Sequence, residues 1–122
     1  MPPPTPPRRT SWKGFAAYDR RDLAAARRLL SAPASSEPLE TLRRIYLGSA
    51  LAWIGDYAET AALLGSVKLD EVPEPLRGEA RVCLYAAWVG AGRKASADSL
   101  LRLLRAEPGE IGERARRVPE GR

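Results

Sequence analysis

The residue types that carry most enzyme chemistry are scarce in this sequence. It contains no histidine and one cysteine, and its carboxylates stand singly along the chain. A metal site needs several such side chains at close spacing, and the sequence has no cluster of that kind. The serines Ser49, Ser96 and Ser99 have no imidazole to serve as their general base. We therefore expect a protein that is not an enzyme and that needs no metal or cofactor.

Two other features have a chemical interpretation, a thiol and a glycine-rich segment. Cys83 has no second cysteine with which to form an internal disulfide, so an oxidising compartment has no support. We interpret it as a small buried residue of a helix, because no histidine activates its thiol. The segment from Gly90 to Lys94 has the glycines and basic residues of a phosphate-binding helix start. A turn between two helices is the stronger interpretation of that segment.

Arginine side chains form one local cluster in a chain whose net charge is +5. Charges over the rest of the central region are nearly balanced, which leaves this cluster as the one credible contact for nucleic acid. Phosphates bind such side chains, and stacking aromatics usually accompany them. Nucleic-acid binding, as an accessory protein, is therefore an alternative hypothesis. Its residues are Arg20, Arg21, Arg27 and Arg28.

The elements that must position these residues are helices, and they recur along the chain. Apolar residues follow helical spacing, and shifting the sequence by 34 residues places Gly14 on Gly48. Beyond this second copy a shift of 37 residues restores the match and places Gly55 on Gly92. We interpret the difference as an insertion of three residues near Gly78. Other matched pairs are Asp22 with Asp56, Leu30 with Leu64 and Leu47 with Leu84.

The repeat resembles the tetratricopeptide repeat, a helix-turn-helix unit of about 34 residues whose copies stack into a superhelix. Features of that family have counterparts in Leu47-Gly48, in the turn Gly55-Asp56-Tyr57 and in the small residues Ala26 and Ala97. The departures from its pattern are Thr60, Tyr85 and Arg93. The resemblance implies an all-α fold, a right-handed superhelical stack of about three helical hairpins, formed by three diverged copies over about residues 10 to 108.

The chain divides into three parts by composition. Residues 1–10 are rich in proline, which favours a solvated polyproline-like tail, with the first helix starting near Ser11. Residues 11–108 form the helical domain, and residues 109–122 form a charged tail or partial cap. No apolar run is long enough to cross a membrane, and the N-terminus lacks the apolar centre of a signal peptide. We expect a soluble cytoplasmic protein without membrane contact.

The resemblance implies a concave groove, lined by the first helix of each hairpin, that takes a peptide or helix of another protein. The residues it places on this inner face are Phe15, Tyr18, Ile45, Ser49, Ala52, Val82, Ala86 and Val89, with Trp53 at the edge. Packing in the core is the alternative for each residue, and it is about as good for the alanines and valines. Phe15 and Tyr18 are favoured, because aromatic side chains supply most contact energy at interfaces.

Two arginines lie one repeat apart, and we expect them to face the same groove. Arg44 and Arg81 would grip an acidic side chain or a C-terminal carboxylate of the partner. A non-enzymatic interaction module, acting as an adaptor, scaffold or chaperone-like protein, is therefore the leading hypothesis.

The end of the helical array has its own consequence. A stack of repeats exposes the apolar face of its last unit unless a polar element covers it. Only three apolar residues follow the last predicted helix, Ile111, Ala115 and Val118. We therefore expect a thin cover and, as an alternative function, a structural subunit that self-associates. The face in question carries Leu100, Leu101, Leu103 and Leu104.

Overall fold

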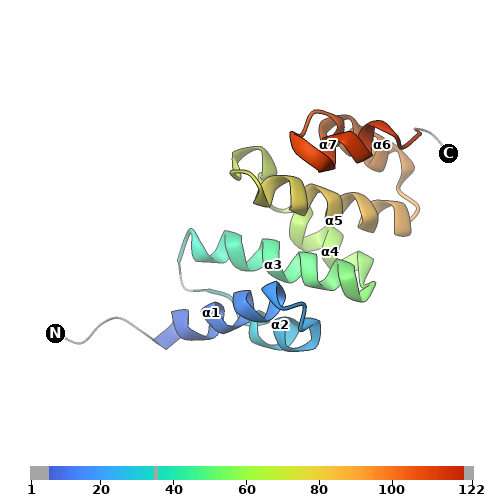
Figure 1. The fold of residues 1–122 in the computed structure, drawn as a ribbon. Helices are drawn as coiled ribbons and strands as arrows, with labels where there is room; N and C mark the ends of the chain where they lie inside the picture. Colours follow the sequence, from blue (N-terminus) through green and yellow to red (C-terminus); the bar gives the residue numbers. More distant parts are fainter. Residues whose placement is uncertain (1–5, 35, 120–122) are drawn as a thin grey trace.

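A computed structural model describes residues 6–34 and 36–119, and the regular elements in this part of the chain are all helices, with no strand (Figure 1). The predicted all-α class is confirmed. The elements in chain order are α1 (Pro6–Asp19), α2 (Leu23–Leu29), α3 (Leu39–Ile54), α4 (Tyr57–Gly65), the short 3-10 helix η1 (Leu69–Glu71), α5 (Leu76–Gly90), α6 (Lys94–Arg105) and α7 (Gly109–Arg116).

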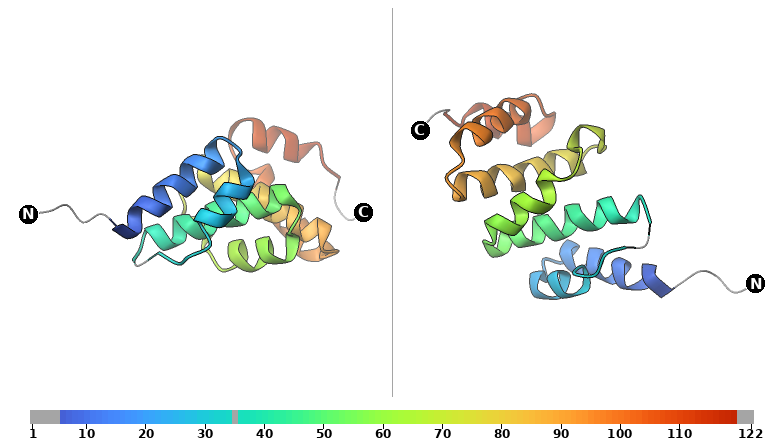
Figure 2. Two further views of the ribbon diagram at one scale, coloured as in Figure 1. Left: turned by 90° about the horizontal axis from the view of Figure 1, so that it is seen from below. Right: turned by 180° about the vertical axis from the view of Figure 1, so that it is seen from behind.

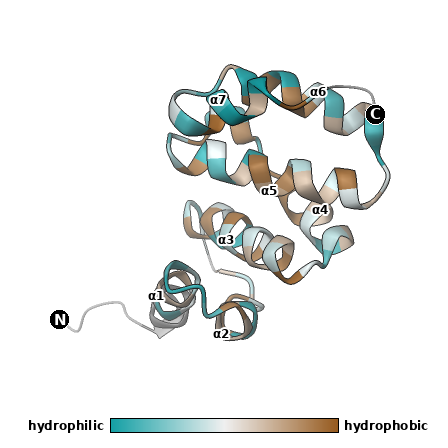
Figure 3. Cartoon of the chain, turned by 45° about the vertical axis from the view of Figure 1, so that its right-hand side comes forward, coloured by the Kyte–Doolittle hydropathy of each residue, from teal (hydrophilic) through white to brown (hydrophobic). Residues whose placement is uncertain are grey.

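Helices that are consecutive in the sequence pack as neighbours, and α3 and α5 join them into one body. Helix α3 contacts α1, α2, α4 and α5, whereas α5 contacts α3, α4, α6 and α7. Figure 2 shows the result from two further sides: α1 and α2 lie at one end, α6 and α7 at the other, and α3 to α5 between them. In Figure 3 hydrophobic segments recur through α3 and α5, whereas α7 is largely hydrophilic.

Two clusters of buried apolar residues fill the interior. One cluster lies among α1, α2 and α3 and includes Ala17, Leu30 and Leu51. The other lies among α3 to α7 and includes Ile45 and Leu101, both almost fully buried. Each side chain of this kind contributes roughly 1.5–3 kcal/mol when it leaves water, so the two clusters hold the helices in their order.

The turns joining α1 to α2, α3 to α4 and α5 to α6 close with the same backbone hydrogen bond. The amides of Asp22, Asp56 and Arg93 donate to the carbonyls of Ala17, Leu51 and Trp88 over 2.8, 2.9 and 2.8 Å. The residue before each of these amides has a positive φ. These residues are Arg21 (60°), Gly55 (98°) and Gly92 (76°). Glycine adopts this conformation without a Cβ clash, whereas arginine is strained there.

Close approach of paired helices depends on glycine at two matched positions. A Cβ on Gly48 would lie 2.8 Å from the Leu64 side chain, and one on Gly14 would lie 2.5 Å from Leu30. Between α3 and α4 the contact is reinforced by Thr60, whose hydroxyl donates to the Gly48 carbonyl over 3.0 Å. The hairpins α1/α2 and α3/α4 are therefore built on the same close contact.

The three residues inserted between the second and third repeats lie between α4 and α5. Their predicted position near Gly78 is wrong. The amide of Thr41 donates to the Glu37 carboxylate over 3.0 Å, and the amide of Gly78 donates to the Glu74 carboxylate over 3.1 Å. The longer spacing therefore already holds at the start of α5. The added length is accommodated in the loop that contains η1, which buries Leu69 against the core.

The first helix begins earlier than predicted. It starts at Pro6 and not near Ser11, because proline fits the first turn of a helix, where its missing amide hydrogen would have no partner. The tail predicted over residues 1–10 is therefore helical from residue 6. Its first five residues lie outside the described part of the chain.

Helix α7 covers the face of α6 that was expected to be open. Leu100, Leu101 and Leu104 are 6, 1 and 3% exposed, and only Leu103, at 47%, faces solvent. Three of the four leucines are therefore not available for self-association, contrary to the prediction. The cover is held by more than its apolar residues, because the Arg105 guanidinium donates to the carbonyls of Ala115 and Val118.

Candidate functional site

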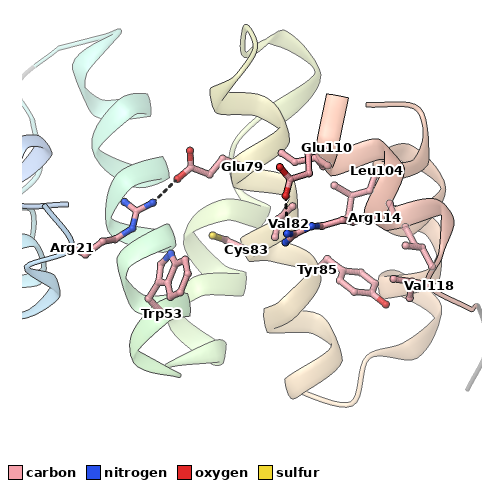
Figure 4. A pocket seen from close by; sticks show the side chains of 13 residues that line it. Arg21, Trp53, Glu79, Val82, Cys83, Tyr85, Leu104, Glu110, Arg114 and Val118 are labelled. Atoms are coloured by element: carbon pink, nitrogen blue, oxygen red, sulfur yellow. Dashed lines mark ion pairs between the residues drawn. The ribbon is translucent and has the colours of Figure 1, made fainter. Parts of the chain in front are cut away.

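A groove of about 680 Å³ runs between α5 and α7 and extends to the ends of α1 and α3. We call it the α5/α7 groove. Figure 4 shows Trp53 and the Arg21–Glu79 ion pair on one side of it and Tyr85 and Val118 on the other, with Cys83 between them. Its remaining lining residues are Val82, Leu101, Leu104, Glu110, Ile111, Arg114 and Ala115.

Helix α5 carries an exposed apolar face that begins at Val82 in the groove and continues beyond it. Val82, Ala86 and Val89 are spaced by four and three residues and so lie on one face of the helix; Val82 is 42% exposed and Val89 53%. Trp53, at the end of α3, is 61% exposed and lines the same groove. Apolar side chains gathered in this way on a surface mark interaction sites more often than isolated ones do.

Two ion pairs form the charged rim of the groove. Arg21 lies 3.5 Å from Glu79, and Arg114 lies 2.7 Å from Glu110. All four side chains are between 41 and 77% exposed, and solvent-exposed pairs of this kind contribute little to stability. The rim therefore offers both signs of charge at small energetic cost to the fold.

Arg21 is held by groups from three elements. Its guanidinium carbon lies 4.4 Å from the centre of the Tyr18 ring and 5.5 Å from that of Trp53. It also donates to the Tyr18 carbonyl over 2.9 Å. The Tyr18 hydroxyl in turn donates to Glu79 over 2.9 Å. The turn after α1 is thereby connected to the C-terminal end of α3 and to α5.

Tyr18 and Cys83 are buried beside the groove and remain neutral. Burial is the main cause that raises the pKa of Tyr18, and the charge of Glu79 raises it further. The phenol therefore stays protonated and donates its hydrogen bond to Glu79. Burial also raises the pKa of the Cys83 thiol, which leaves it without the thiolate that reactivity requires.

The structure brings only part of the predicted inner face to the groove. Trp53 and Val82 line it, and Ala86 and Val89 continue its α5 face, whereas Phe15 packs against Tyr46 with ring centres 4.6 Å apart. The others are covered: Tyr18 is 4% exposed, Ile45 0% and Ser49 2%, and Ala52 packs against the core. The reason is that α3 has neighbours on several sides.

Arg44 and Arg81 do not form the predicted carboxylate grip. Arg81 is buried and is already paired, donating to Glu107 over 2.8 Å and to Asp70 over 2.5 Å. Arg44 pairs with Glu40 over 2.8 Å and lines a separate pocket near η1. Both arginines therefore hold parts of the fold together and point away from the α5/α7 groove.

The arginine cluster is divided by the fold. All four arginines are exposed, but the Arg21 guanidinium lies over the rings of Tyr18 and Trp53 and pairs with Glu79. The patch that remains for a nucleic acid is therefore smaller than the sequence suggested.

Several groove residues were missed by sequence reasoning. Glu79 and Tyr85 belong to α5 but showed no distinguishing pattern, and the Arg21–Glu79 pair joins residues far apart in sequence. Ile111 and Val118 were assigned only as cover for α6, yet they also line the groove. The spacing of four residues between Ile111 and Ala115 was the signal that α7 would present one apolar face, and Val118 lies just beyond the end of that helix.

The described part of the chain is all-helical and carries a groove with apolar walls and a charged rim. Within residues 6–34 and 36–119, no group of side chains could hold a metal ion. None of the helices described is long and apolar enough to cross a membrane. Comparisons with protein-family models, with curated proteins and with solved structures find no match for this chain.

Proposed function

We propose that the helices form a diverged tetratricopeptide-like array and that the protein is a non-enzymatic interaction module. The array is supported by features that recur at the spacing of the sequence repeat. The turns within the hairpins α1/α2, α3/α4 and α5/α6 share one backbone hydrogen bond and one positive φ, and Gly14 and Gly48 make the same contact with a leucine. The interaction role is supported by the α5/α7 groove, whose surface is apolar and open.

The partner in this proposal is a helix or peptide with an apolar face. The single observation that carries it is the joint exposure of Trp53, Val82 and Val89, at 61, 42 and 53%. Burying the exposed part of each valine is worth about 1 kcal/mol and that of the tryptophan about 3 kcal/mol. Aromatic anchors beside apolar residues are typical of the energetic centre of an interface, and the two rim ion pairs supply polar contacts around it.

The test compares capture of a partner by the wild-type chain, by Val82→Asp and by Leu103→Asp. Leu103 is the matched control, because it is a similarly exposed apolar residue on α6 that does not line the groove. Each tagged variant is first shown by circular dichroism to be folded and is then incubated with an extract of its own cells. A protein recovered by wild type and Leu103→Asp but lost by Val82→Asp supports the proposal.

Two outcomes would contradict it. Equal recovery with Val82→Asp would remove the groove from the interaction. Recovery that disappears after nuclease treatment would instead favour the exposed arginines, Arg20, Arg27 and Arg28, as contacts for nucleic acid.

A further inference from the structure

Arg21 occupies a backbone position that the other turns give to glycine. Its φ is 60°, and the corresponding residues of the next two turns are Gly55 and Gly92. A residue with a side chain is strained in this region, and strain that persists in a fold points to a use for the side chain. The contacts that the structure gives for this side chain are made by its guanidinium.

The guanidinium lies in a site with the chemistry of cation recognition. Two aromatic rings face it, those of Tyr18 at 4.4 Å and Trp53 at 5.5 Å, and cations bind such ring faces through the ring quadrupole. The carboxylate of Glu79 lies 3.5 Å away. It is oriented by the hydrogen bond from the Tyr18 hydroxyl, so it does not depend on Arg21 for its position.

The ion pair between Arg21 and Glu79 is longer and more exposed than the ion pair between Arg81 and Glu107. The side chains of Arg21 and Glu79 are 47 and 41% exposed. By contrast, the side chains of Arg81 and Glu107 are 9 and 1% exposed and lie 2.8 Å apart. Arg21 can therefore leave its site without opening the core, and Trp53 and Glu79 would then stay in place at the edge of the α5/α7 groove.

We propose that Tyr18, Trp53 and Glu79 form a binding site for an arginine side chain of a partner and that Arg21 occupies this site in the free protein. This inference rests on the proposed function of the groove and names the charge its partner carries. A guanidinium is the ligand because the chain's own guanidinium already fits between the rings and the carboxylate. An apolar partner segment with an arginine at one end would fill the groove and replace Arg21.

The test removes the internal ligand and offers a free one. Arg21→Gly deletes the side chain and relieves the positive φ, so the turn is expected to fold. The probe is Nα-acetyl-arginine N-methylamide, titrated while the indole N–H signal of Trp53 is followed by NMR; Trp53→Phe identifies that signal. We expect Arg21→Gly to bind the probe about fivefold more tightly than wild type, because an occupied site lowers apparent affinity by its free fraction.

Three controls make the result specific. The uncharged analogue Nα-acetyl-citrulline N-methylamide should not bind, and Arg21→Gly combined with Glu79→Gln should lose the gain. Arg20→Ala, which removes the neighbouring exposed arginine, should bind the probe as wild type does. If Arg21→Gly does not fold, Arg21→Gln keeps a side chain without the charge and is used in its place.

Other outcomes would overturn the inference. Unchanged affinity in Arg21→Gly would mean that Arg21 has only a structural role in its turn, and equal binding of the citrulline analogue would mean that the site takes no cation. The outcome is separable from that of the proposed function. A gain of probe binding together with unchanged capture by Val82→Asp would keep the cation site and remove the groove interaction.

Discussion

Replacing Glu107 by glutamine is expected to lower the free energy of unfolding by about 2–3 kcal/mol. The Glu107 side chain is 1% exposed, and one of its oxygens accepts from Arg81 over 2.8 Å and from Arg77 over 3.3 Å. Removing one partner of a buried ion pair costs about 3–5 kcal/mol. We expect the smaller loss of about 2–3 kcal/mol, because both arginines still have another carboxylate partner in the variant. Arg81 remains paired with Asp70, and Arg77 remains paired with Glu74.

The pH dependence of this effect has a definite sign. Burial acts to raise the pKa of Glu107, but the hydrogen bonds it accepts, among them those from Arg77 and Arg81, outweigh burial and hold the pKa below its usual value. Glu107 therefore stabilises the fold fully above the pKa of the unfolded carboxyl, about 4.3. That contribution is lost as the pH falls through the lower, folded pKa.

The assay is urea unfolding followed by circular dichroism, with wild type and Glu107→Gln compared at neutral pH and at successively lower pH. The difference between them should be largest at neutral pH and shrink towards zero in acid. Glu113→Gln is the matched control, because Glu113 is an exposed glutamate of α7, and it should change stability by less than about 0.5 kcal/mol. A Glu107→Gln loss that is equally small, or that is the same at every pH, would refute the reasoning.

Four further variants test local features by the same unfolding measurement. Gly112→Ala should lower the free energy of unfolding by about 2 kcal/mol, because the added Cβ would overlap the carbonyl oxygen of Glu107, a backbone atom that cannot move aside cheaply. Gly65→Ala is its control: a Cβ there meets open space, so the change should be neutral or should stabilise by up to about 1 kcal/mol. Asp56→Ala should cost about 1 kcal/mol, because the carboxylate caps α4, and an unchanged midpoint would argue against that cap. The hydrogen bond from Arg43 is the main cause that lowers the pKa of Glu40 to about 2. Glu40→Gln should therefore reduce the free energy of unfolding above about pH 4.3 and lack the acid-induced decrease that this carboxylate gives the wild type below that pH. Parallel plots of stability against pH for the two proteins would contradict this.

Local signals were enough to predict the all-α class and the turn between α3 and α4. Asp56 caps α4 and Gly55 takes the positive φ before it, and both effects depend only on residues close in sequence. The exception was the start of α1 at Pro6, where proline density suggested an extended tail although the first turn of a helix tolerates it.

The candidate site was less predictable, because helical spacing says which residues share a face but not what covers it. Ile45 and Val82 lie on corresponding faces of α3 and α5 by that spacing, yet one is fully buried and the other 42% exposed. The pairing of Arg81 with Glu107 joins residues far apart in sequence. Nothing in the local pattern around Arg81 distinguishes an internal partner from a ligand.

Helix α7 is at once the lid of the hydrophobic interior and one wall of the groove. Contacts of α7 with α6, and the ion pairs of Glu107 just before α7, therefore determine how often this helix opens. Each opening also removes one wall of the groove. A ligand that binds only the closed state lowers the population of the open state. It therefore slows amide hydrogen exchange in α7 by the factor 1 + L/Kd, where L is the free ligand concentration. Exchange protection of this one helix would thus report occupancy of the groove by any ligand that also contacts α7.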